Sequence, residues 1–272
     1  MRFAALAAIL VVPVSAAAQV AQNRSTAYLH PTDVRDARAV WVNPAGLATQ
    51  REASVYADID VQDPGNKGRL RQISAGFNSR GLAFAYQRDV FDGGRRGHTY
   101  RLGLAGGARG LSGGAAMSLY RGDTKGTGWD VGLTYSIEGT TALTVGGVIS
   151  NIGQPVVRGL QQRTTFIPGA TWRPLGPASA VSIHARLTSD SVIGYAFGLS
   201  WQGSGAGGRW PLGVLARLDT DGGLRRGAFS LGLSLGGPDR VGLVASAPGD
   251  LSGVDAVSLW GLSTRQPAAG RR

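Results

Sequence analysis

Large apolar and small or polar residues alternate along most of the chain from Glu52 onward. The odd positions from 193 to 201 carry Ile, Tyr, Phe, Leu and Trp, whereas the even positions from 192 to 200 carry Val, Gly, Ala, Gly and Ser. Residues 129–138 and 229–236 repeat this pattern. Because successive side chains of a β-strand point to opposite faces, a period of two predicts strands.

Turn-forming sequences separate the alternating runs, for example Asn78-Ser79-Arg80-Gly81 and Asp221-Gly222-Gly223. Each run is close to the roughly 9–11 residues that a tilted transmembrane strand needs, and an even strand number is typical of bacterial barrels. We predict about 14 strands, which begin near residues 52, 69, 82, 98, 111, 128, 141, 164, 179, 191, 209, 226, 240 and 253.

The composition of the second face distinguishes a membrane barrel from a soluble sandwich. In a sandwich that face meets water and carries many charges, whereas here it carries mostly Gly, Ala, Ser and Thr. A long apolar face suits lipid, and a small polar face suits a lumen. We therefore predict an all-β fold, a single transmembrane antiparallel β-barrel over residues 52–265, in contact with membrane lipids and followed by a polar tail, residues 266–272.

Aromatic residues near the strand ends fit two interfacial girdles: Tyr86, Tyr100, Tyr120, Trp129, Trp172, Trp201, Trp210 and Trp260.

The N-terminal part of the chain differs from the alternating part. Residues 1–18 combine a positive start, an apolar run and a small-residue ending, which is the pattern of a secretory signal peptide. The apolar run, residues 4–14, is shorter than the roughly 20 residues of a transmembrane helix. We therefore expect an exported protein that enters the membrane through strands.

Residues 19–51 are predicted to form a short helical, hatch-like segment ahead of the barrel. Thr32 or Asp33 is a candidate N-cap for a helix whose apolar face includes Trp41. Residues 43–47, Asn-Pro-Ala-Gly-Leu, end that helix with turn chemistry.

Composition narrows the functional classes. The chain has no Cys, which excludes disulfides and thiolate chemistry. The formal net charge is +11, but the basic residues are scattered through turns without a nucleic-acid-binding motif, so we expect no nucleic-acid partner. There are 43 glycines, and runs such as residues 103–107 and 203–208 lack the context of phosphate loops. Glycine on the inner face would instead leave room for the N-terminal segment or a ligand.

Residues 36–48, which read DARAVWVNPAGLA, follow the signal-like segment and precede the train of strands. This arrangement resembles the long-chain fatty-acid transporter superfamily of outer-membrane proteins, including the branch that contains the shuttle barrels of type nine secretion. The resemblance implies an N-terminal hatch inside the lumen and the passage of hydrophobic molecules, often through a lateral opening. The loops of this chain look short, unlike those of a large ligand-capturing surface.

Two groups of residues are candidates for function. A movable plug would have its hinge at Trp41, Asn43, Pro44 and Gly46. The polar residues predicted to line the lumen are Asp58, Asp60, Arg101, Asp130, His184 and Arg186. The two aspartates of the first strand are expected to pair with Arg101, Arg186 or Arg217 rather than to act as an acid/base pair. No catalytic residue, cofactor or metal site is predicted, because the three His lack metal-ligand spacing.

Three functions remain open at this point. The first is passage or binding of hydrophobic or amphipathic small molecules across the outer membrane, which makes the chain a transport protein rather than an enzyme. The second is a non-conducting barrel that serves as a secretion shuttle or binds an envelope protein partner. The third is a lipid-modifying barrel enzyme that uses His184.

Overall fold

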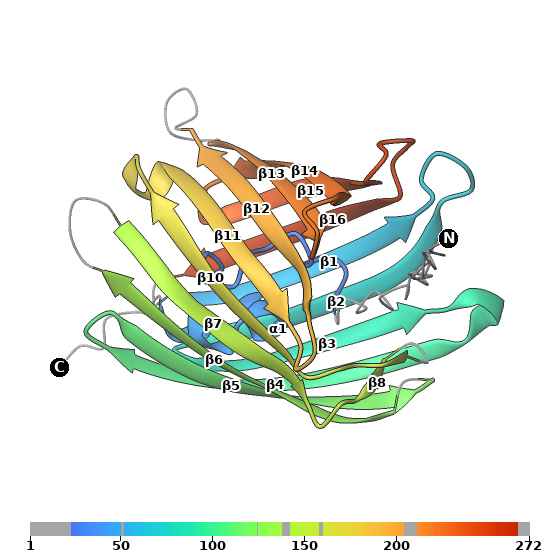
Figure 1. Cartoon of the computed structure of the whole chain (residues 1–272), viewed down its shortest axis with the longest axis horizontal. Coiled ribbons are helices and arrows are strands. Elements are labelled where there is room, and N and C mark those ends of the chain that lie inside the picture. The colour runs from blue at the N-terminus through green and yellow to red at the C-terminus, as the bar shows by residue number, and fades with distance from the viewer. Residues whose placement is uncertain are drawn as a thin grey trace, which may run out of the picture.

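The structure, a computed structural model, describes residues 23–49, 52–123, 125–137, 142–157, 160–203 and 211–265. Within these residues, fourteen antiparallel strands pair in chain order, and the first pairs with the last to close a barrel (Figure 1). The predicted all-β barrel of about 14 strands is confirmed. The predicted signal segment and the polar tail lie outside the described residues.

The predicted strand starts lie within about three residues of the observed ones. The barrel strands are β1 (Ala53–Gln62), β2 (Arg69–Ser79), β3 (Leu82–Val90), β4 (Arg96–Ala108), β5 (Leu111–Gly122), β6 (Gly126–Ile137), β7 (Ala142–Ile152), β10 (Thr165–Arg173), β11 (Ser179–Leu187), β12 (Val192–Gln202), β13 (Leu212–Asp221), β14 (Arg226–Gly236), β15 (Asp239–Pro248) and β16 (Ala256–Arg265). The short helices are α1 (Ala39–Val42) and the 3-10 turns η1 (Pro44–Ala48), η2 (Asp92–Gly94) and η3 (Gly176–Ala178).

A small hairpin was not predicted. Strands β8 (Val156–Val157) and β9 (Leu160–Gln161) pair with each other in the connection between β7 and β10. Strands of two residues are too short to show alternation, so the hydrophobic pattern gave no signal for them.

The two ends of the barrel differ in their connections. At the end where β1 begins and β16 ends, which we call the turn end, Arg80-Gly81 and Arg109-Gly110 make two-residue turns. Both residues of each turn have positive φ, as the tight hairpins of twisted strands require. The opposite end, the loop end, carries the longer connection with β8 and β9.

The outer surface of the barrel is apolar, and the inner surface is polar. On β14, Leu231, Leu233 and Leu235 are about half exposed, at 47%, 51% and 48%, whereas Ser230 faces inward and is buried. A closed barrel satisfies every strand hydrogen bond without leaving an edge, which membrane-spanning backbone requires. An apolar belt on such a barrel therefore fits a bilayer.

The aromatic residues do not all lie in the belt. Trp129, Trp172 and Trp201 are exposed on the outer face, as the girdle interpretation predicts. Tyr120 and Trp260 point inward and are buried, so the interpretation is wrong for them. Trp210 lies outside the described residues. No helix in the described part of the chain is long and apolar enough to cross a membrane.

Residues 23–49, which we call the plug, lie inside the barrel, as the blue segment of Figure 1 shows. Its helical parts are the single turn α1 and η1, and the predicted helix start at Thr32 or Asp33 is wrong. The hydroxyl of Thr32 hydrogen-bonds Thr171 of β10, and the carboxylate of Asp33 pairs with Arg173. Both side chains are therefore used to bind the wall instead of capping a helix.

We predict that a charge in the apolar belt destabilises the barrel and that the same charge in a turn does not. Leu231→Arg should lower the free energy of unfolding in lipid vesicles by about 2–4 kcal/mol, because a charge deep in the bilayer is poorly solvated. Leu175→Arg, in the exposed turn before η3, should change it by no more than about 1 kcal/mol. Equal effects of the two substitutions would contradict a membrane-embedded belt.

Candidate functional site

The plug packs against a part of the inner wall that has no side chains. Added Cβ atoms at Gly132 of β6 and Gly114 of β5 would overlap Asn43 and the backbone of Pro44. A Cβ at Gly103 of β4 would press on Leu47 of η1. Strands β4, β5 and β6 contact η1 along this floor. The inner-face glycines therefore provide the space that the plug occupies.

Residues within the plug also pack tightly against one another. The side chain of Asn43 donates a hydrogen bond to the Pro31 carbonyl and accepts one from the Ala45 N–H, which caps η1. A Cβ at Gly46 would overlap the carbonyl oxygen of Val34. Asn43, Pro44 and Gly46 are buried, so three of the four predicted hinge residues lie where the plug is most tightly packed.

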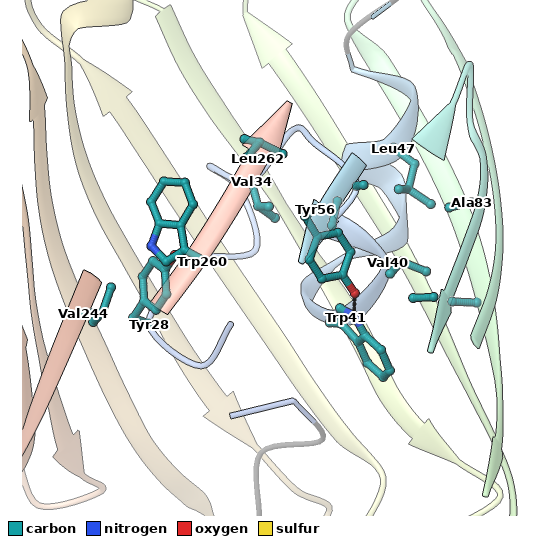
Figure 2. Close-up of a cluster of buried hydrophobic side chains, with 14 residues drawn as sticks. Tyr28, Val34, Val40, Trp41, Leu47, Tyr56, Ala83, Val244, Trp260 and Leu262 are labelled. Atoms are coloured by element: carbon teal, nitrogen blue, oxygen red, sulfur yellow. Dashed lines mark hydrogen bonds between the residues drawn. The ribbon is translucent and has the colours of Figure 1, made fainter. Parts of the chain in front are cut away.

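The fourth predicted hinge residue, Trp41, joins the plug to the wall. Its indole N–H donates to the hydroxyl of Tyr56 on β1, the contact drawn as a dashed line in Figure 2. The guanidinium of Arg101 lies 5.3 Å from the centre of the Trp41 ring, a distance at which a cation and a π-face attract. Arg101 also pairs with Asp130 and donates to Ser118. Trp41, Arg101 and Asp130 thus form one buried group.

Asp58 and Asp60 of β1 are buried on the inner face, 3% and 2% exposed. Asp58 accepts a hydrogen bond from Ser74 at 2.6 Å, and Asp60 accepts one from Ser258 at 2.9 Å. Asp58 therefore pairs with a hydroxyl and not with an arginine, which corrects the predicted ion pair. Arg101, one of the partners predicted for these aspartates, pairs with Asp130.

Further hydrogen bonds satisfy the backbone of the plug. The wall donates to plug carbonyls through Arg217 to Leu29 and through Asn78 to Leu47. Ser54 accepts from the N–H of Ala37. Buried backbone groups need such partners. Side chains of the polar inner face therefore supply hydrogen bonds that helices or strands would otherwise supply to the plug backbone.

A pair of histidines joins the plug to β11. His30 Nδ1 lies 3.0 Å from His184 Nδ1, and a hydrogen bond between two ring nitrogens needs one donor and one acceptor. At least one ring is therefore neutral. Burial, and then the charge of Arg217, lower the pKa of His30 to about 3. The hydrogen-bond partner of His184 in the described part of the chain is His30 and not a serine hydroxyl.

In the described part of the lumen, one chamber lies on each side of the plug. The loop-side chamber, about 510 Å³, is lined by plug residues and by Asp130, His184, Arg186 and Arg217. The turn-side chamber, about 320 Å³, lies among the turn-end parts of β11 to β16. Leu29 lines both chambers, so the plug around Leu29 is the partition between them.

The six predicted lumen residues divide between these features. Asp130, His184 and Arg186 line the loop-side chamber, where Arg186 lies 3.7 Å from Asp219. Arg101 lies under Trp41, and Asp58 and Asp60 lie in the wall beside the first residues of the plug. Sequence reasoning found no metal-ligand spacing for His30 and did not single out Tyr56 or Asp219. The alternation that places Tyr56 on the same face as Asp58 was a usable signal for it.

Among the described residues, no three His, Asp or Glu side chains lie together as a metal-binding group. The two closest histidines bond each other.

No protein-family model and no curated protein matches the sequence. Solved structures with a similar fold are outer-membrane channels of low identity. The "CymD monoaromatic hydrocarbon channel" is 11% identical, with a TM-score of 0.52 over 84% of this chain and 91% of that one. The "KdgM porin" is 9% identical, with a TM-score of 0.43 over 77% and 98%. Omp33 of Acinetobacter baumannii is 9% identical, with a TM-score of 0.45 over 80% and 100%. The likeness to CymD supports the barrel fold, and the resemblance to fatty-acid transporters stays a prediction.

We predict that one methyl group on the glycine floor loosens the plug. Gly132→Ala places a Cβ against Asn43, and overpacking of this kind costs about 1–3 kcal/mol. Trypsin should then cut the plug at Arg24, Arg35 or Arg38 several-fold faster in intact proteoliposomes. Gly106→Ala is the matched control, because a Cβ at Gly106 meets nothing within 4 Å. Equal cleavage rates in both variants would show that the floor does not hold the plug.

Proposed function

We propose that the chain is an outer-membrane barrel that passes small amphipathic molecules when the plug moves. The observation that carries this proposal is the partition: two chambers lie in one lumen, and a short plug segment around Leu29 separates them. A molecule in the loop-side chamber would need only this segment to shift in order to reach the turn side.

The lining of the loop-side chamber supports an amphipathic solute. Leu29, Val42, Ile167 and Ile193 provide apolar contacts, and Arg186 and its neighbours provide charge. Mixed linings of this kind hold ligands by apolar burial and orient them with a few polar groups. The name of CymD, a monoaromatic hydrocarbon channel, is compatible with such passage.

The packing of the plug supports movement of residues 23–35 and not of the whole plug. Residues 44–48 are seated on the glycine floor, whereas residues 23–35 are held to the wall by separate hydrogen bonds. We propose that residues 41–46, with Trp41, Asn43, Pro44 and Gly46, stay in place as the hinge. The segment before them would swing away when a solute replaces its hydrogen bonds.

A reversible lock tests this proposal. The chain has no Cys, so the double variant Thr32→Cys with Thr171→Cys can form only one disulfide, at a site where the two hydroxyl oxygens are 2.8 Å apart. We expect the oxidised variant to pass at least about tenfold less solute into proteoliposomes than its reduced form, since the bond ties the plug to β10.

The control joins two wall strands and leaves the plug free. Ser230→Cys with Ser246→Cys replaces hydroxyls that are 2.9 Å apart on β14 and β15, so oxidation should not change passage. Passage that continues unchanged through the locked barrel would contradict plug movement. A barrel that passes no solute in any state would favour the non-conducting interaction module.

A further inference from the structure

The turn-side chamber has more positive than negative charge. Its lining includes four arginines, Arg35, Arg38, Arg173 and Arg240, and two aspartates, Asp33 and Asp36. Asp36 is bound by Arg38 through two oxygens at 2.7 and 2.9 Å, and Asp33 pairs with Arg173. Among the described residues, the guanidinium groups of Arg35 and Arg240 form no ion pair within 4 Å, although Asp33 faces Arg35 and Asp36 faces Arg240 at longer range.

The contacts of these two arginines are weak. Arg35 reaches the hydroxyl of Thr144 at 3.5 Å, and Arg240 reaches the side-chain oxygen of Gln202 at 3.4 Å. Both distances are at the limit of a hydrogen bond. Burial first, and then the charge of Arg173, lower the pKa of Arg35, and the charge of Asp33 offsets part of this effect.

Several N–H donors around the same chamber have no acceptor. The Nη1 atom of Arg173, the Nε atom of Arg240 and the indole Nε1 of Trp260 are buried, and no hydrogen-bond partner for them lies in the described part of the chain. Arg173 and Trp260 are 7% and 8% exposed. Buried donors without acceptors are costly, and donors in excess of acceptors favour a ligand that only accepts.

We propose that the turn-side chamber binds the carboxylate or phosphate group of a small anionic molecule. Arg240 and Arg35 supply the charge, and the buried N–H groups of Arg173 and Trp260 that have no acceptor would turn toward a bound anion as further donors. The apolar part of a bound molecule would lie against Trp260 and Leu215, which line the same chamber. Together with plug movement, the site would select anionic amphipathic solutes, but binding itself does not depend on passage.

Binding to the purified full-length barrel in detergent tests the site separately from passage. Benzoate and benzamide have nearly the same shape, but only benzoate carries a charge. We expect benzoate to bind at least about tenfold more tightly than benzamide, because charge-assisted hydrogen bonds are the stronger ones. Arg240→Gln should weaken benzoate by about tenfold or more. The control Arg95→Gln removes the same charge at an exposed position near the loop end and should change nothing.

Further variants keep the test decisive if Arg240→Gln fails to form a heat-modifiable barrel. Arg35→Gln removes the other unpaired charge, and Trp260→Phe removes the indole donor while keeping a ring under Arg38, whose guanidinium lies 4.5 Å away. Each should weaken benzoate several-fold. Competition by inorganic phosphate would show that the site binds an anionic group without a ring, and benzoate binding without such competition would show that the ring is required. Equal binding of benzoate and benzamide, or affinity unchanged in all three variants, would overturn the site.

Discussion

The lumen of a fourteen-stranded barrel is wider than its own inward side chains can fill, and the rest of this structure depends on how that space is occupied. Here a 27-residue stretch of the chain, residues 23–49, fills it. The fit requires wall positions without side chains, which is why Gly103, Gly114 and Gly132 face η1. Glycine would weaken an ordinary strand, so its abundance on the inner face reflects the plug.

A plug with little helix must satisfy its backbone by other means. Its N–H and C=O groups bond to wall side chains such as Ser54, Asn78 and Arg217. The inner face is therefore polar without being highly charged, and the buried cations are mostly matched by carboxylates, as in Arg101 with Asp130. The turn-side chamber departs from this balance, because its lining includes four arginines and two aspartates, and the anion site is proposed on that ground.

The sequence predicted the barrel well because strand alternation is local and repeats many times. It predicted the contents of the lumen poorly because those contacts join distant residues, such as His30 with His184. The helix start at Thr32 was misplaced for the same reason, since its hydroxyl bonds Thr171. The ion pair expected for Asp58 required knowing which strands lie beside β1, and the neighbours there supply Ser74 instead of an arginine.

The central claim is that residues 23–35 divide the lumen, and single-channel recording tests it most directly. In a planar bilayer without solute, the intact chain should show almost no steady current. A variant that lacks residues 23–35 should conduct steadily, because the two chambers would then join. A large, steady current through the intact chain, unchanged by the deletion, would contradict the account.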